Sequence, residues 1–301
     1  MGLSARRTGS ALLFAASFIW GTSFVAQRIG AGYVGTFTFL AVRFAIATLS
    51  LLPVVYFVSG RKNAPKTAEG LRGLLAGSFC CGMMLFTFAA LQQTGLPHTT
   101  VGKAGFITAL YIVVVAAIGA FSGHRVRPVI WVCIAIALAG MYALCIKGEF
   151  ALSMGDAFMA GGALFVALHI LCVGHFSQRV DALWLSCLQF LTCSLISLPL
   201  ALLLERPTLP GLVGAMWPLL YTGVLCGAVA YTFQVVGQAR VNPMITSLIL
   251  SLESVFAALA GWAVLGEVLS HKELFGCALI FTSVIVAQVA NSFGKDADRG
   301  A

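Results

Sequence analysis

Charged residues are scarce in this sequence. Only 9% of its 301 residues are Asp, Glu, Lys or Arg, whereas 60% are hydrophobic. A water-soluble domain carries about 25% charged residues, so the composition excludes that class and indicates an integral membrane protein. The net charge of +8 does not indicate a nucleic-acid partner, because the basic residues lie scattered between hydrophobic segments and do not form runs with interleaved aromatic residues.

Several functional motifs are also missing. The sequence contains no HExxH, GxSxG or P-loop pattern, so we expect neither an enzyme nor a cofactor. The nine cysteines lie in apolar stretches without metal-ligand spacing, and the adjacent Cys80 and Cys81 are expected to be buried packing residues. No cleavable signal peptide follows Arg6 and Arg7, because their apolar run continues into another hydrophobic span.

Long apolar stretches are what the sequence does contain. A bilayer-spanning helix needs about 20 mainly apolar residues, and ten stretches are long enough. They cover residues 10–27, 35–58, 71–93, 99–121, 127–146, 156–175, 182–204, 212–238, 243–265 and 271–290. The connections are short, the longest being residues 59–70, so any function must take place within the membrane.

The basic residues predict how these spans are oriented in the lipid bilayer. When both termini and the connections after even-numbered spans lie on one side, that side holds twelve Lys and Arg residues and the other holds four. The positive-inside rule therefore predicts that both termini are cytoplasmic and that residues 147–153 lie outside the cell. The oligomeric state stays open between a monomer and a homodimer.

The sequence also repeats itself. The segment CGMMLFTF at 81–88 matches CGAVAYTF at 226–233. Because each half has five spans, an odd number, the second half crosses the membrane in the opposite orientation to the first. The predicted fold is therefore an all-α membrane protein with ten transmembrane helices in two inverted five-helix repeats, at residues 10–146 and 156–290.

Four segments resemble the EamA-like family of the drug/metabolite transporter superfamily. They are IWGTSFVAQRIG (19–30), FTFLAVRFAIATLSLLP (37–53), HTTVGKAGFITALYIVV (98–114) and LILSLESVFAALAGWAVLGE (248–267). The resemblance implies ten helices in two inverted repeats and an exporter of amino acids, metabolites or toxic compounds in the bacterial inner membrane. Many members have a proline after the glutamate of the ninth span, where this sequence has Ser254, so no proline kink is expected there.

Glu253 is the leading candidate for a functional residue. It lies about halfway along the ninth span, where a carboxylate costs roughly 2.5–3.5 kcal/mol on insertion scales. Ser251 belongs to a stripe of hydroxyl residues beside it. Two interpretations stay open: Glu253 binds a substrate group or carries a proton in a cavity, or it is a structural carboxylate bonded to neighbouring helices.

Two basic residues also lie within spans. Lys103 could line an outer vestibule and attract an anionic substrate group, or it could reach the lipid headgroups as a snorkelling lysine. Arg43 lies deeper, where it must bond carbonyl oxygens, a carboxylate or water. The family resemblance favours a structural role for Arg43.

Uncharged polar and aromatic residues complete the candidate site. Tyr231 and Gln234 share a polar stripe on the eighth span that could bind an amino-acid-like solute or simply join helices. His169 could titrate near neutrality or be a bonded core histidine. The remaining candidates are Trp20, as the wall of a cavity, and two residues on one face of the fourth span, Thr108 and Tyr111.

The pattern as a whole favours a secondary transporter of small molecules. Its two halves would rock around a cavity near the membrane midplane, driven by a gradient, with proton coupling left open, because no ATP site is present. A channel-like pore with one fixed opening and a non-transporting receptor or scaffold are the alternatives. The sequence does not identify the small-molecule substrate.

Overall fold

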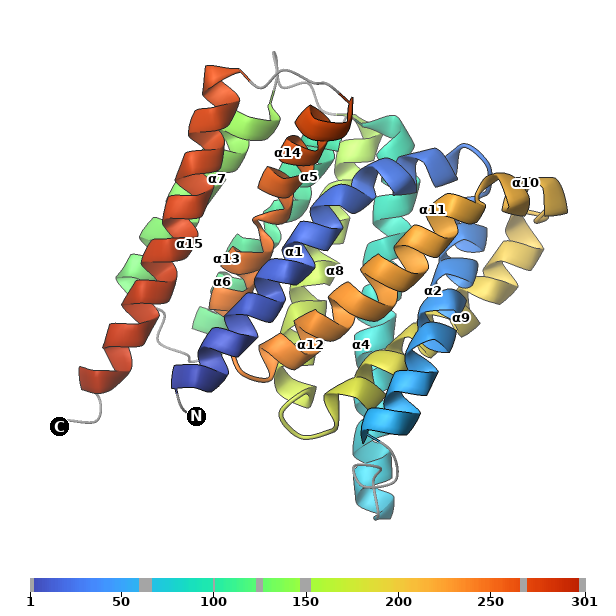
Figure 1. Cartoon of the computed structure of the whole chain (residues 1–301), viewed down its shortest axis with the longest axis horizontal. Coiled ribbons are helices and arrows are strands. Elements are labelled where there is room, and N and C mark those ends of the chain that lie inside the picture. The colour runs from blue at the N-terminus through green and yellow to red at the C-terminus, as the bar shows by residue number, and fades with distance from the viewer. Residues whose placement is uncertain are drawn as a thin grey trace.

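The computed structural model describes residues 3–59, 67–99, 101–122, 127–146, 153–265 and 270–297. Within these ranges the secondary structure is helical and contains no strand. Figure 1 shows that the chain ends marked N and C lie at the same end of the molecule, as an even number of membrane crossings requires. Of the predicted outer connection at residues 147–153, residues 147–152 lie outside the described residues.

The helices of the first half follow the predicted spans closely. They are α1 (Leu3–Ala31), α2 (Thr36–Val54) with the short π-helix η1 (Val55–Ser59), α4 (Ala68–Gly95) with the 3₁₀ turn η2 (Leu96–His98), α5 (Val101–Ala109), α6 (Tyr111–Phe121) and α7 (Pro128–Cys145). The fourth span thus consists of two helices, α5 and α6.

The second half repeats this order with two further divisions. Its helices are α8 (Met154–Phe176), α9 (Ala182–Leu204), α10 (Leu209–Gly214), α11 (Met216–Leu220), the π-helix η3 (Tyr221–Tyr231), α12 (Thr232–Gln238), α13 (Pro243–Leu250), α14 (Glu253–Leu265) and α15 (His271–Ala297). The eighth span consists of α11, η3 and α12, and the ninth of α13 and α14.

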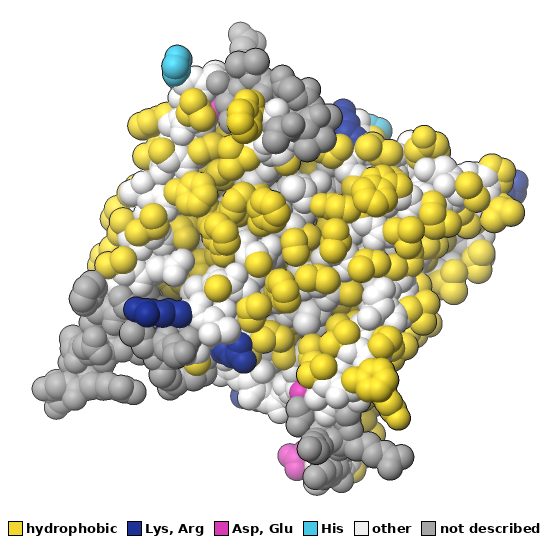
Figure 2. Space-filling model, viewed as in Figure 1, with side chains coloured by type: hydrophobic (Ala, Val, Ile, Leu, Met, Phe, Trp, Pro, Cys, Tyr) yellow, Lys and Arg dark blue, Asp and Glu magenta, His cyan; other side chains and the backbone are white. Residues whose placement is uncertain are grey.

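The composition of the helices confirms the predicted fold class. In the described residues nine segments are long and apolar enough to cross a membrane, and a tenth apolar helix, Pro128–Leu144, is somewhat shorter. Figure 2 shows hydrophobic side chains over the middle of the visible face and charged side chains toward its two ends. This is the surface expected of a bundle surrounded by lipid hydrocarbon.

The pattern of helix contacts follows the inverted repeat. The third span, α4, packs against α8 and α9, while η3 and α12 of the eighth span pack against α1, and η3 also packs against α2. Exchanging spans one to five with spans six to ten converts the first set of contacts into the second. The pairs α2–α9 and α7–α15 are converted into themselves. All of these contacts join one half to the other, so the two repeats pack as a single bundle.

Equivalent glycines set the helix spacing in both halves. A methyl carbon on Gly82 of α4 would lie 2.6 Å from the β-carbon of Thr192 in α9. A methyl carbon on Gly227 of η3 would lie 2.7 Å from the β-carbon of Ala47 in α2. Carbon atoms in contact are normally about 3.5–4.0 Å apart, so neither helix pair has room for a larger residue.

Two buried hydrophobic clusters flank the first helix. One includes Met141 of α7 and Ile280 of α15, and the other includes Phe44 of α2 and Phe190 of α9. The rings of Phe44 and Phe190 stack with their centroids 6.0 Å apart. Trp20 of α1 packs against both clusters, so the middle of α1 lies where the two packed blocks of the bundle meet.

The fourth and ninth spans are interrupted without proline. Leu110 separates α5 from α6, and Ser251 with Leu252 separates α13 from α14. At each break an amide bonds to a carbonyl three residues earlier, from Leu110 to Ile107 and from Leu252 to Ile249. Such bonds tighten the helix locally, so each repeat carries a divided helix near the middle of the bundle.

Candidate functional site

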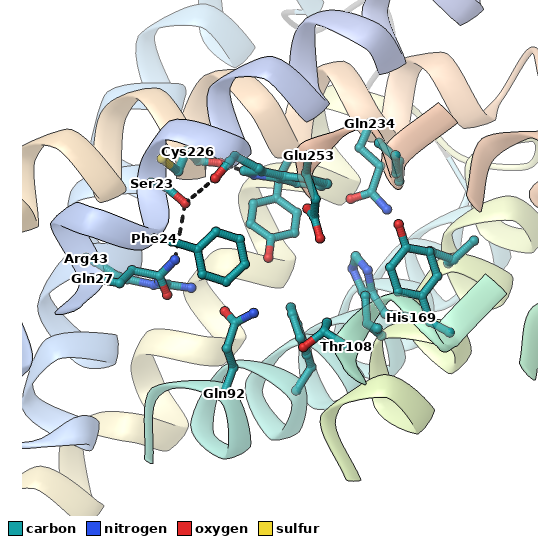
Figure 3. Close-up of a pocket in the computed structure, with 17 residues that line it drawn as sticks. Ser23, Phe24, Gln27, Arg43, Gln92, Thr108, His169, Cys226, Gln234 and Glu253 are labelled. Atoms are coloured by element: carbon teal, nitrogen blue, oxygen red, sulfur yellow. Dashed lines mark hydrogen bonds between the residues drawn. The ribbon is translucent and has the colours of Figure 1, made fainter. Parts of the chain in front are cut away.

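A cavity lies at the level of these two helix breaks. Its empty volume is about 580 Å³, counting its open mouth. Side chains from seven spans form the wall, namely the first, second, third, fourth, sixth, eighth and ninth (Figure 3). The cavity therefore lies between the two repeats and belongs to neither alone.

Most candidate residues from the sequence lie in this wall. They are Trp20, Arg43, Thr108, Tyr111, His169, Tyr231, Gln234 and Glu253. Ser251 is not among the wall residues; it is fully buried, and its hydroxyl donates to the carbonyl oxygen of Leu248 at 2.7 Å. Lys103 is part of α5, but its side chain lies outside the described part of the structure. Whether the lining residues bind a solute stays a prediction.

Glu253 is the first residue of α14, and its carboxylate points into the cavity (Figure 3). Its side chain is only 8% exposed, and no hydrogen-bond donor or basic group among the described residues contacts the carboxylate. A negative charge in the first turn of a helix gains about 0.3–1 kcal/mol from the helix dipole. This gain offsets only part of the roughly 2.5–3.5 kcal/mol cost of the charge in a membrane span.

Arg43 supplies the positive charge of the cavity wall. Its Nη1 donates to Oε1 of Gln27 at 3.2 Å, and its guanidinium carbon lies 4.6 Å from the ring centroid of Phe44. Stacking on an aromatic ring contributes about 0.5–2 kcal/mol. Within the described ranges no carboxylate pairs with Arg43. The geometry gives Arg43 fixed structural contacts and a face toward the cavity.

Aromatic residues connect the two charged groups. The ring centroids of Trp20 and Tyr231 are 4.6 Å apart, and the indole Nε1 of Trp20 donates to the carbonyl oxygen of Cys226 at 3.2 Å. Tyr231 lines the same cavity as Arg43 and Glu253. The cavity thus has a carboxylate and a guanidinium that are not paired with each other and share an aromatic wall.

Two further polar groups in the wall lack partners. His169 Nε2 lies 3.0 Å from Oε1 of Gln189, but its Nδ1 is buried with no hydrogen-bond partner among the residues described. The side chain of Gln234 is 1% exposed, and its Oε1 is also without a described partner. A buried polar atom without a partner costs about 1–3 kcal/mol, so both atoms add to the cost of the polar groups placed around the cavity.

Two other candidates are already bonded within the protein. The hydroxyl of Tyr111 donates to the carbonyl oxygen of Ser247 at 3.3 Å, which joins α6 to α13. The hydroxyl of Thr108 donates to Sδ of Met159 at 3.6 Å. These contacts fix the positions of the two side chains in the wall, so their chemistry is less available to a solute than that of Glu253.

The eighth span enters the wall as a π-helix. The matching segment of the third span is part of the regular helix α4, although the two segments, CGAVAYTF and CGMMLFTF, are similar. A π-helix bonds residues five apart, so Cys226 and Tyr231 come to lie on the same face and both line the cavity. Helices of this type are rare and occur frequently at functional sites.

The first span contributes three more residues to the wall than the sequence predicted. Ser23, Phe24 and Gln27 also line the cavity. They follow Trp20 at helical spacings of three, four and seven residues, which places all four on one face of α1. The amide of Gln27 within an apolar span was the available signal, and its bond to Arg43 is what positions it.

Known proteins resemble the chain over most of its length. The model of the EamA-like transporter family matches residues 7–146 and 153–288. A protein from Archaeoglobus fulgidus, named as an uncharacterized transporter, is 29% identical over 279 residues, which cover 91% of this chain and 83% of the relative. The Escherichia coli K12 protein named as uncharacterized inner membrane transporter YedA is 25% identical over 284 residues, 91% of this chain and 88% of its own. A solved crystal structure with 19% identity has a TM-score of 0.77 and covers 94% of this chain and 97% of its own, which shows the same fold.

Proposed function

Because the chain belongs to the EamA-like transporter family and is a multi-pass membrane transporter, we propose that it exports small molecules by alternating access. The solutes are metabolites, amino acids or drug-like compounds. The observation that carries the proposal is the carboxylate of Glu253, which faces a cavity between the two repeats without a partner in the described part of the chain. We therefore assign Glu253 to solute binding and coupling rather than to helix packing.

The energetics of Glu253 support this assignment. The insertion cost of roughly 2.5–3.5 kcal/mol exceeds the gain of about 0.3–1 kcal/mol from the start of α14. Nothing in the described part of the chain supplies the difference, so we infer that it is met by water, by a cationic or hydrogen-bonding group of a solute, or by a proton. Each of these enters through the cavity, so the state of Glu253 changes with the cavity contents.

Proton coupling follows because a proton and a basic solute group would compete for the carboxylate of Glu253. A proton neutralises Glu253 when the cavity holds no basic solute group, and it leaves when such a group binds the carboxylate. If the cavity opens in turn to each side, proton entry then drives solute exit. The divided helices α5–α6 and α13–α14 support this movement, because each contributes a residue at its break, Tyr111 or Glu253, to the wall.

The membrane and the orientation are part of the proposal. We assign the protein to the inner membrane with both termini in the cytoplasm, and twelve basic residues on that side against four on the other support the orientation. Figure 1 supports a common side for the two termini, since α1 begins and α15 ends at one end of the bundle.

Flux measurements distinguish this proposal from its alternatives. Metabolites in the medium of cells with and without the protein are first compared to identify exported solutes. Purified protein in lipid vesicles is then tested with each of them. A transporter gives flux that saturates with solute and shows counterflow, whereas a fixed pore gives neither and a receptor or scaffold gives no flux. Identical media and no flux in vesicles would refute the transport proposal.

The variant Glu253→Gln tests the role of the carboxylate. Gln keeps the size and hydrogen-bonding ability of the side chain but cannot titrate. We expect concentrative export to be lost while some downhill exchange remains. Ser251→Ala is the matched control, because Ser251 lies on the same span but outside the cavity. If Glu253→Gln inserts and transports like the parent at every pH, the carboxylate is structural.

A further inference from the structure

Two cysteines from opposite repeats meet near one end of the bundle. The sulfur atoms of Cys80 in α4 and Cys172 in α8 are 3.5 Å apart, although the residues are separated by 92 positions in the chain. Both side chains are partly exposed, and the structure has both as free thiols. Helix α4 belongs to the first repeat and α8 to the second, so this contact joins the halves of the protein.

We propose that Cys80 and Cys172 form an oxidisable dithiol whose disulfide locks the two repeats together. A disulfide has an S–S bond of about 2.05 Å, so the sulfur atoms must approach by about 1.5 Å. Side-chain rotation can supply this movement, because the two helices already pack along their length. The reaction with a peroxide balances: two thiols and one peroxide give one disulfide and two molecules of water.

The surroundings single out this pair among the neighbouring cysteines. Cys81 and Cys193 lie in the same region but are fully buried, and the thiol of Cys193 donates to the carbonyl oxygen of Gly82 at 3.2 Å. An oxidant dissolved at the membrane surface or in the lipid therefore reaches Cys80 and Cys172 before the other two.

The position of the pair favours access from the side where the termini lie. Cys172 precedes the end of α8 at Phe176 by four residues, which corresponds to about 6 Å along the helix. Gly77 of α4 packs directly against the ring of Phe176, so α4 passes the same level there. The dithiol thus lies about one helical turn inside the end of α8 at Phe176, on the side where the termini lie (Figure 1).

The disulfide would act on the cavity through the two helices that it joins. Gln92 of α4 and His169 of α8 both line the cavity wall. A covalent link between α4 and α8 fixes the spacing of these helices and opposes any rocking of one repeat against the other. This consequence rests on the proposed function, whereas formation of the disulfide does not.

Oxidation of the full-length protein in membranes tests the dithiol. Membranes are treated with hydrogen peroxide, the remaining thiols are blocked with N-ethylmaleimide, and the peptides are analysed by mass spectrometry without reductant. We expect a linked peptide pair containing Cys80 and Cys172 that disappears after reduction. Cys172→Ala should abolish it, and the control Cys187→Ala should retain it, because Cys187 is buried in another cluster. Absence of the linked pair in the parent protein would overturn the proposal.

Transport by the same oxidised membranes tests the lock. We expect loss of flux in the parent, recovery after reduction, and no response in Cys172→Ala. A parent that forms the disulfide and still transports at its full rate would overturn the locking role. A reduced parent that transports no solute would refute the proposed function instead, and the linked peptide would still decide whether the dithiol exists.

Discussion

Replacing Gly21 with alanine tests a close helix contact next to the wall residue Trp20. Gly21 lies in α1 next to Trp20, where α1 crosses the start of α14. A methyl carbon at this position would lie 2.6 Å from the carbonyl oxygen of Glu253 and 2.6 Å from the β-carbon of Phe256. Normal contacts between such atoms are about 3.5–4.0 Å, so the substitution requires α1 and α14 to separate by about 1 Å.

The cost of this separation can be estimated against a matched control. Overpacking of this kind destabilises proteins by about 1–3 kcal/mol. Alanine also gains about 0.5–1 kcal/mol over glycine within a helix, which complicates any single variant. Gly162→Ala in α8 gains the same helix stability from replacing glycine with alanine. Its methyl group, however, would lie 3.6 Å from the ring of Phe88, which is an ordinary contact. The difference between the two variants therefore isolates the overpacking cost of about 1–3 kcal/mol.

Thermal unfolding in detergent measures this difference. At about 2 °C per kcal/mol for a chain of this size, Gly21→Ala should unfold about 2–6 °C below Gly162→Ala. Transport should fall as well, because the separation of α1 from α14 displaces Trp20 and Glu253 from each other. Equal midpoints for the two variants would refute the claim that α1 and α14 are in backbone contact at the cavity.

Three other predictions test separate parts of the structure. The carboxylate of Glu205 accepts hydrogen bonds from the amides of Phe37 and Thr38 at 2.8 and 2.7 Å, and so caps the start of α2. Glu205→Gln should therefore lose about 1–2 kcal/mol of stability, and an unchanged melting midpoint would contradict the capping role. Arg43→Lys keeps the positive charge but loses the stacking of the flat guanidinium on the ring of Phe44. We expect a loss of about 1 kcal/mol of stability in the same assay, and a change below about 0.5 kcal/mol would show that the stacking is unimportant. A cysteine placed at Asn63 in a background without native cysteines should not react with an impermeant label in intact cells, and labelling there would reverse the predicted orientation.

The sequence alone determined the membrane architecture, because lipid imposes a local rule. A chain that crosses hydrocarbon must satisfy its backbone bonds within each helix and present about 20 apolar residues, so each span can be recognised without its neighbours. The segment that recurs at 81–88 and 226–233 indicated a repeat, and five spans per half, an odd number, indicated that the second half is inverted. Both features can be read from the chain without knowing how the helices pack. Glu253 was recognisable as a candidate because a charge within such a span is costly wherever the helix packs.

Only the tertiary structure decided which side chains face the cavity. Lipid and packed protein are both apolar, so the hydrophobic pattern cannot tell the face of a helix that contacts lipid from the face that contacts another helix. Ser251 was therefore a candidate beside Glu253 from the sequence, yet it is fully buried and is not among the residues of the cavity wall. The break before Glu253, formed without proline, and the meeting of Cys80 with Cys172 depend on how α4, α8 and α14 pack, and such long-range contacts leave no local pattern in the chain.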